Sequence, residues 1–284
     1  MNKWLFFLCL ILFLSLSISY ILENNATPAI TYFPDDEKST FTKAESNLGL
    51  FLPKGNDSYE IVWTSDSESD KEMYLRQDAS LLFDNGRLRG VRSTWTQDTK
   101  QIHIEEKLLS EDSSFFQVIT FHHGEIHYPE DQIKSIHQMS SDHLYVIDSP
   151  STSLDAFKTP EDKFEEEWEN LLDRTTKQQL LYHWDQLFTH FSIDSESYLS
   201  VPLTSLVKYN SSPLPSMSQE QTDKVIGQLW EGVYKNYIIP AVNTENSQLQ
   251  SYVPIVLFDK DNNHLLVLYE LNGKKHKLIQ HYSI

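Results

Sequence analysis

The feature that most restricts the fold of this chain is an uncharged apolar run near its start. Residues 4–22 contain no charged side chain, with Lys3 before them and Glu23 after them. A helix needs roughly 20 apolar residues to cross a bilayer core about 30 Å thick, so this run is long enough to span one. Because basic residues stay on the cytoplasmic side, Lys3 predicts a cytoplasmic N-terminus and an extracytoplasmic body.

The same run also fits the apolar region of a signal peptide. Ser17 and Ser19 are small residues at the positions that a signal peptidase reads, which would place cleavage after Ser19 and release the body. Against cleavage, the apolar run continues through Ile21 and Leu22. We therefore expect a single-pass membrane protein that contacts the membrane through residues 4–22, with a secreted form as the alternative.

The rest of the chain is acidic and lacks cysteine. The protein has a formal net charge of −18, and its single cysteine, Cys9, lies inside the apolar run. An acidic surface repels nucleic acid, so no nucleic acid is expected as a partner, whereas the basic surfaces of other proteins are suitable. Without cysteine, the body has no disulfide, no thiolate metal site and no cysteine nucleophile. We expect an envelope protein or a wall polymer as the partner.

The body begins with patterns that are typical of antiparallel strands. Residues 23–47 are polar and acidic, and we expect them to form a stalk between the membrane and the body. The clearest local pattern is a hairpin in residues 73–95, because Asn85-Gly86 suits a tight type I′ turn. Further short strand patterns follow, so residues 48–150 are predicted to form a β-rich meander.

Helical patterns follow the β-rich region. Apolar stripes predict either one bent helix or two consecutive helices within residues 159–191, with Thr159 as the N-terminal cap. Another helix is predicted to begin at Ser218, because Ser218 and Gln221 have the spacing of a capping box.

The order of these patterns predicts the fold class. Three strand patterns close the chain, in residues 252–258, 264–271 and 276–282. Strands that cluster, followed by helices that cluster, argue against a parallel βαβ sheet. We therefore predict an α+β fold: an N-terminal antiparallel β meander, then helices, then a C-terminal three-stranded antiparallel meander, behind one N-terminal transmembrane helix. Residues 151–284 either share one domain with residues 48–150 or form a second one.

Three residues of the segment FHHGEIH are candidate metal ligands. On a continuous strand, His123, Glu125 and His127 project from one face, and two imidazoles with a carboxylate can bind zinc. The alternative places His123-Gly124 in a turn, which separates the three side chains. We prefer the turn, because it explains the glycine directly.

A second candidate site binds anions. Arg87, Arg89 and Arg92 lie close together in the sequence, and the planar guanidinium suits a carboxylate or a phosphate. The alternative is that these arginines pair with acidic residues such as Asp84 across the sheet. We prefer pairing, because the chain is strongly acidic.

Tryptophan side chains form the third candidate, a groove for a glycan or a peptide. Tryptophan at helical or strand spacing is more often part of a core, and four of these five fall on predicted core faces or in apolar strands. The residues concerned are Trp63, Trp95, Trp168, Trp184 and Trp230.

The segment DKDNNHLLVLYE, residues 259–270, matches the acidic positions of an EF-hand calcium loop. His264 replaces the glycine that the sharp turn of such a loop needs, and the flanking runs have strand character. We therefore predict a β-hairpin without a specific calcium site. Glycine-rich phosphate-binding motifs are also absent from the sequence, so no cofactor is expected.

Two classes of function remain. Motifs such as HExxH and GxSxG are absent, so no catalytic residue is assigned from the sequence. The leading interpretation is a membrane-tethered extracytoplasmic binding or regulatory protein of the bacterial cell envelope, without catalytic activity. The alternative is a cell-envelope hydrolase whose carboxylates or histidines meet only in the folded chain.

Overall fold

The computed structural model describes residues 29–51, 58–150, 152–244, 249–261 and 263–282. The predicted membrane segment and its candidate cleavage site lie outside these residues. Within the described ranges, no helix is both long enough and apolar enough to cross a bilayer.

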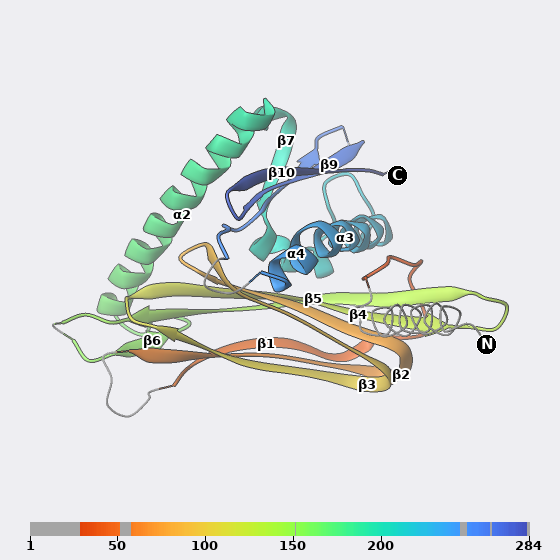
Figure 1. The fold of residues 1–284 in the computed structure, drawn as a ribbon, viewed down its shortest axis with the longest axis horizontal. Helices are drawn as coiled ribbons and strands as arrows, with labels where there is room; N and C mark the ends of the chain where they lie inside the picture. The colour runs from red at the N-terminus through yellow and green to blue at the C-terminus, as the bar shows by residue number, and fades with distance from the viewer. Residues whose placement is uncertain (1–28, 52–57, 151, 245–248, 262, 283–284) are drawn as a thin grey trace, which may run out of the picture.

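Strands dominate the described chain and form two antiparallel sheets (Figure 1). The larger sheet has the order β1-β2-β4-β5-β6, and β3 pairs with the other edge of β2. Its strands are β1 (Phe41–Phe51), β2 (Tyr59–Asp84), β3 (Arg87–Ser110), β4 (Ser114–His127), β5 (Ile133–Ile147) and β6 (Asp155–Phe157). The smaller sheet has the order β10-β9-β8-β7. Its strands are β7 (Tyr198–Pro202), β8 (Ile255–Asp259), β9 (His264–Leu271) and β10 (Lys274–His281).

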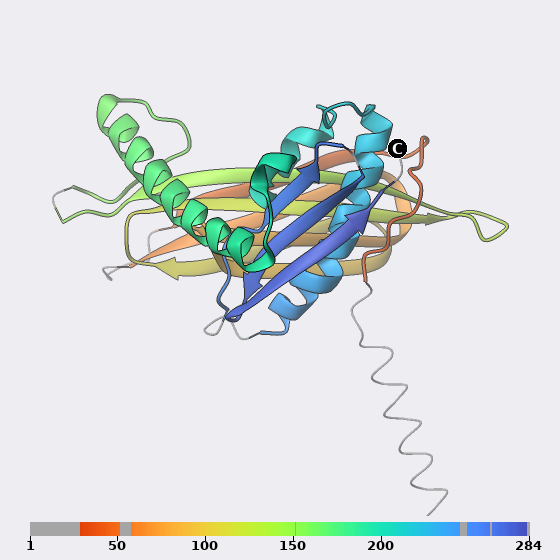
Figure 2. The same ribbon diagram turned by 90° about the horizontal axis from the view of Figure 1, so that it is seen from above.

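The helices and the smaller sheet lie on one side of the larger sheet (Figures 1 and 2). The helical elements are α2 (Lys163–Phe191), η1 (Ser195–Ser197), η2 (Leu203–Asn210), α3 (Gln219–Val233), the π-helical η3 (Tyr234–Ile238) and α4 (Ile239–Val242). Seen from above, the smaller sheet crosses over the long strands, and α2 slants over one end of them (Figure 2). The fold is therefore α+β, as predicted.

Two of the predicted helix starts have different outcomes. The Ser218–Gln221 capping box is present at the start of α3, as predicted. The cap predicted at Thr159 is wrong, because α2 starts later, where the Asp162 carboxylate accepts the backbone N–H of Glu165. The first turn after this cap is acidic, and its carboxylates interact favourably with the positive end of the helix dipole. Of the two alternatives for this region, α2 is one continuous helix.

Each of the two long strands, β2 and β3, passes through both layers of the larger sheet. The first half of β2 pairs with β1, and its second half pairs with β4. Between Glu68 and Met73 the register of β2 and β3 shifts, and such irregularities bend a strand. As a result β1 lies across β4 and β5, where Ser46 contacts both Thr120 and Ser140. The sheet thus folds on itself into two facing layers (Figure 1), and we call the side chains packed between these layers the folded interior.

The second halves of β2 and β4 present different residues on their two faces. One face packs with α3 and the smaller sheet in the main core, and it carries Ala79, Leu81, Phe83, Ile119 and Phe121. The other face points into the folded interior and includes five buried polar residues: Arg76, Asp78, Ser80, Thr120 and His122. An apolar cluster closes one end of this interior, around Trp63, Leu82 and Val118.

The stalk expected for residues 23–47 differs from the structure in its second half. β1 begins at Phe41, and Ile30 is only 1% exposed within the main core. Asp36 donates its backbone N–H to the carbonyl of Ser135, so the chain before β1 is fixed to the edge of β5. The strand was missed because only its end carries inward apolar residues, Leu48 and Leu50, and the earlier inward residues Ala44 and Ser46 are small.

Both predicted hairpins are present. Asn85 and Gly86 have the positive φ angles of the tight turn between β2 and β3. Strands β8 and β9 form the second hairpin, where the Asp259 carboxylate accepts the backbone and side-chain N–H groups of Asn263. The three predicted C-terminal strands are present as β8, β9 and β10, and β7 adds a fourth strand that was not predicted.

Candidate functional site

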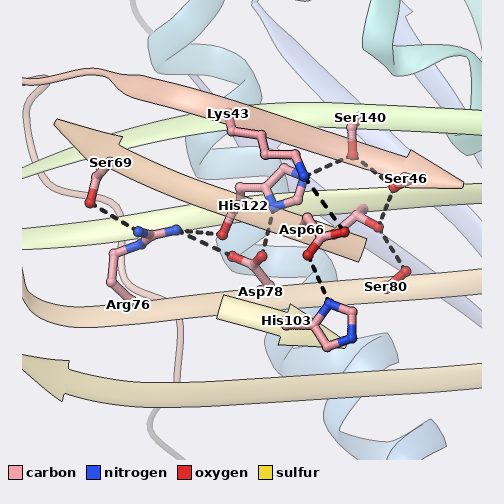
Figure 3. A network of polar contacts seen from close by, with 12 residues as sticks. Lys43, Ser46, Asp66, Ser69, Arg76, Asp78, Ser80, His103, His122 and Ser140 are labelled. Carbon is pink, nitrogen blue, oxygen red and sulfur yellow. Dashed lines mark hydrogen bonds and ion pairs between the residues drawn. The ribbon is translucent and has the colours of Figure 1, made fainter. Parts of the chain in front are cut away.

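A polar network occupies the middle of the folded interior (Figure 3). Its centre is a carboxylate, an imidazole and a hydroxyl in series. Asp78 Oδ2 lies 2.8 Å from His122 Nδ1, and His122 Nε2 lies 2.7 Å from Ser140 Oγ. Asp78 and His122 are 0% exposed, and Ser140 is 7% exposed. The three residues come from β2, β4 and β5, so only the folded sheet brings them together.

A buried guanidinium balances the carboxylate of this series. Arg76 is 0% exposed, and its Nη2 lies 3.9 Å from Asp78 Oδ1. Its two terminal nitrogens also donate to the hydroxyls of Ser67 and Ser69 and to the carbonyl of Lys100. Burial lowers the pKa of Arg76, and the nearby Asp78 opposes this effect. The folded interior therefore holds one cation and one anion as neighbours, which buried charges require.

Four hydroxyl groups continue the series toward an indole. The Trp63 Nε1–H donates to Ser80 Oγ at 2.9 Å. From there, oxygen–oxygen contacts of 2.7, 2.8 and 2.7 Å connect the hydroxyls in the order Ser80, Thr120, Ser46 and Ser140. The row ends at the imidazole of His122. It is a single hydrogen-bonded path from an indole to a carboxylate.

The two ends of this path determine its direction. The Trp63 indole nitrogen can only donate a hydrogen bond, and the Asp78 carboxylate can only accept one. Each hydroxyl has one proton, so every donor is used only if each hydroxyl donates toward His122. We therefore assign the tautomer in which Nδ1–H donates to Asp78 and Nε2 accepts the proton of the Ser140 hydroxyl. We call this path the hydroxyl relay.

Three cavities are lined by successive residues of β5. Their volumes are about 350, 310 and 330 Å³ in order along the strand. Met139 lines the first and the second cavity, and Ser141 lines the second and the third. Neighbouring cavities share a lining residue, so the three follow one another along β5, and we call this row of cavities the β5 groove. Ser46 and Ser140 of the hydroxyl relay line its middle cavity.

The walls of the β5 groove come from segments far apart in the sequence. β1 and the residues before it supply one side, and η2 and α3 supply the other. Asn210 of η2 accepts the N–H of Met139 at 3.2 Å and donates to its carbonyl at 2.7 Å. This contact satisfies main-chain groups that the edge strand would otherwise expose.

The β5 groove is acidic. Its ionisable lining residues comprise five carboxylates and two imidazoles: Asp35, Glu45, Asp142, Asp173, Asp223, His137 and His143. Among the described residues, no lysine or arginine lines any of the three cavities. Burial raises the pKa of Asp223, with a further contribution from Asp35, while Gln219 and His137 act in the opposite direction. A cation in the first cavity would relieve this unfavourable environment.

The predicted metal ligands lie together on one face of β4, where both imidazoles approach the Glu125 carboxylate. His123 Nε2 lies 3.5 Å from Glu125 Oε1, and His127 Nε2 lies 3.6 Å from Glu125 Oε2. Burial lowers the pKa of His123, which is 2% exposed. In the part of the chain that the structure describes, no group of three such side chains is placed to hold a metal ion. The geometry thus gives the metal hypothesis no support.

The turn predicted at His123-Gly124 is wrong, because β4 continues through both residues to His127. The glycine has a different purpose. A Cβ atom on Gly124 would lie 2.3 Å from the sulfur of Met73, so only glycine allows this close approach. The actual turn follows at residues 128–132, where Tyr128 donates its N–H to the carbonyl of Gln132.

The three candidate anion-binding arginines do not form a common site. Arg89 pairs with Asp84 at 3.5 Å, and Arg92 pairs with a glutamate of β3. The Arg87 guanidinium lies 5.6 Å from the centre of a tyrosine ring. The structure therefore supports the pairing alternative for Arg89 and Arg92.

The tryptophans are dispersed and do not line a common groove. Trp63 lies in the folded interior, and Trp184 and Trp230 lie in the main core. Trp168 borders a small cluster under α2, and Trp95 is 37% exposed on β3. Most of them thus belong to cores.

The residues of the hydroxyl relay were missed for a physical reason. His122 belongs to the FHHGEIH segment, but Asp78 is 44 residues and Ser140 is 18 residues away from it. No local motif connects them, and their polar side chains resemble the solvent side of a strand. Comparison of the chain with protein-family models, with curated proteins and with solved structures finds no match. Function must therefore be argued from this geometry.

Proposed function

We propose that this protein is a membrane-tethered extracytoplasmic binding protein whose ligand is an extended basic peptide segment of a partner envelope protein. The observation that supports this proposal is the β5 groove, with five lining carboxylates and no lining lysine or arginine among the described residues. Within the chain, Glu45 contacts Lys43, Asp142 contacts Lys158 and Asp35 contacts His137. With five carboxylates and no lysine or arginine in the described lining itself, the row favours a ligand with a complementary row of positive charges. Membrane tethering rests on the apolar residues 4–22 of the sequence.

The length of the β5 groove favours an extended chain over a small molecule. Its lining follows β5 from Ile136 to Tyr145. At a rise of about 3.3 Å per residue, this stretch is about 30 Å long. An extended peptide of about ten residues has the same length and places alternate side chains on one side.

The position of the first cavity suggests how binding affects the anchor. Asp35, Ser39, Thr40 and Phe41 line this cavity, and they lie between the predicted membrane segment and the body. A peptide in the first cavity therefore contacts the segment that connects the body to the membrane. Binding there would add contacts to a segment that is already held at the edge of β5.

Calorimetric titration of the full chain in detergent micelles tests the proposal. We expect decalysine to bind, with an affinity that falls as salt is added, and trilysine to bind at least about tenfold more weakly. The double substitution Asp35→Asn/Asp223→Asn should weaken decalysine binding at least about tenfold, which corresponds to about 1.4 kcal/mol.

A matched control removes two charges elsewhere. Glu72 and Glu111 are exposed and line none of the three cavities. The variant Glu72→Gln/Glu111→Gln should bind decalysine as the original chain does. Equal weakening in both double variants would show that only net charge matters and would contradict a groove site. Binding of wall-polymer fragments that decalysine does not displace would contradict the choice of ligand.

A further inference from the structure

The hydroxyl relay reaches the β5 groove at Ser46 and Ser140. Ser140 donates its proton to His122, and it also lines the middle cavity of about 310 Å³. The hydroxyls of Ser80 and Thr120, further along the relay, are 0% exposed and line none of the three cavities. The hydroxyl next to the imidazole therefore has a route to a ligand that the inner hydroxyls lack.

We propose that Ser140 is a nucleophile for acyl transfer, with His122 as its general base and Asp78 as the residue that orients the imidazole. A nucleophilic serine needs a base within hydrogen-bond reach, and that base needs a third group to fix its tautomer. The distances of 2.7 and 2.8 Å in this series meet both requirements. This activity goes beyond ligand binding and revives the hydrolase alternative with residues that the sequence did not indicate.

The chemical step is a two-stage transfer. The Ser140 oxygen attacks the carbonyl carbon of an ester or amide, while its proton moves to His122 Nε2. The resulting tetrahedral adduct breaks down to an acyl-serine, and the alcohol or amine leaves with the proton from Nε2. A water molecule then attacks the acyl group, gives a proton to Nε2, and the carboxylic acid leaves as Ser140 regains its proton. Asp78 accepts Nδ1–H throughout and stabilises the imidazolium that forms.

The charge of the groove indicates the substrate class. Glu45 lines the same cavity as Ser140, and further carboxylates line the cavities on both sides. They favour an ester or amide whose acyl or leaving group carries positive charge. This preference, unlike the reactivity of Ser140 itself, rests on the proposed binding of basic ligands.

Labelling with a fluorophosphonate tests the reactivity without a substrate. This reagent forms a bond between phosphorus and an activated serine oxygen and releases fluoride, while the proton passes to the base. We expect the full chain in detergent micelles to gain one adduct, which peptide mapping places on Ser140. Ser140→Ala should abolish the adduct, and Asp78→Asn should slow its formation at least about 100-fold.

Ser141→Ala is the matched control. Ser141 is the neighbouring serine and lines the same cavity, whereas the hydrogen bonds of Ser140 within the relay go to Ser46 and His122. Labelling should be unchanged in this variant. Absence of an adduct on Ser140 in the folded original chain would overturn the proposal, whatever the variants do. An unchanged labelling rate in His122→Gln would overturn it as well, because a base-independent serine is only an accessible hydroxyl.

The two proposals can fail independently. Labelling of Ser140 requires no basic peptide, and decalysine binding requires no reactive serine. A circular dichroism spectrum of Ser140→Ala that matches that of the original chain would show that this variant is folded.

Discussion

Strands β2 and β4 border an apolar core on one face and a polar interior on the other. On the main-core face of β2 and β4, Leu81 and Phe121 pack among many apolar neighbours. On the opposite face, Arg76, Asp78 and His122 are equally buried but are held by individual hydrogen bonds and ion pairs. The apolar face tolerates the loss of a small contact, because many neighbouring contacts contribute to its stability. On the polar face, each buried group depends on its own hydrogen-bond or ion-pair partner.

The difference between the two faces indicates where a functional site can be expected. Transfer of an ion pair out of water costs several kcal/mol per ion, and an apolar interior of the same volume is often at least as stable. A protein that needed only a filled space between the layers would gain little from Arg76 and Asp78. Departures of this kind from simple packing are typical of functional sites. The main core supplies the stability that allows the folded interior to stay polar.

The largest effect is expected in the main core. Trp230 is 0% exposed, stacks on Phe121 at 4.9 Å between ring centroids, and donates its N–H to the sulfur of Met139. Trp230→Ala should lower the free energy of unfolding by about 3–5 kcal/mol, because it removes buried apolar surface and leaves a cavity. Urea unfolding measures this change, and a loss below about 1 kcal/mol would show that this face does not carry the stability.

A charge removed from the folded interior should cost nearly as much, but for another reason. Arg76→Met leaves Asp78 without its buried cation, and we expect a loss of about 3 kcal/mol. The double variant Arg76→Met/Asp78→Leu should recover part of this loss, because it removes the anion as well but leaves the His122 Nδ1–H without its acceptor. Urea unfolding of both variants separates the two effects. Equal stability of the single and double variants would contradict our account of the polar interior as a mutually dependent set.

Acid should destabilise the chain through His123. Burial lowers the pKa of this imidazole in the folded state, while the unfolded chain titrates near the ordinary value of 6.5. Below that value the unfolded state binds more protons, so stability falls as the pH drops toward the lower folded pKa, by at most about 1.4 kcal/mol per pH unit. His123→Gln should flatten the pH dependence of the unfolding free energy in this window. An unchanged slope would place the acid sensitivity elsewhere.

The smallest effect should have the opposite sign. Burial raises the pKa of Asp223 above 3.8, so its ionised form is disfavoured in the folded chain, and stability falls as the pH rises through the raised pKa. Asp223→Asn should therefore stabilise the chain at neutral pH by about 0.5 kcal/mol, while it weakens decalysine binding. Thermal unfolding measures the gain in stability, and calorimetry measures the loss of decalysine binding. Loss of stability in this variant would mean that Asp223 is structural.

Local patterns in the sequence predict much of the fold. Asn85-Gly86, the Ser218–Gln221 capping box and the C-terminal strands are governed by neighbouring residues, and each is present in the structure. Register is less local: Phe83 pairs with Leu88 close to the turn, but a bulge then makes Gly90 the partner of Leu82.

The candidate site could not be predicted in the same way. A strand that buries polar residues on one face has the same alternation as a strand with a solvent-exposed face. Asp78 and Ser140 therefore resemble surface residues until β1 covers them. Gly124 illustrates the same limit, because a glycine required by close packing against Met73 is indistinguishable in sequence from a turn residue.

The central claim is that the hydroxyl relay has one direction, so that Ser140 donates to the imidazole of His122. Nitrogen NMR of the histidine-labelled full chain in detergent micelles tests it most directly, because protonated and unprotonated ring nitrogens differ strongly in chemical shift. Our account predicts that His122 has its proton on Nδ1, bonded to Asp78, and an unprotonated Nε2 that accepts from Ser140. A His122 signal with the proton on Nε2 would contradict the relay and, with it, the proposed nucleophile.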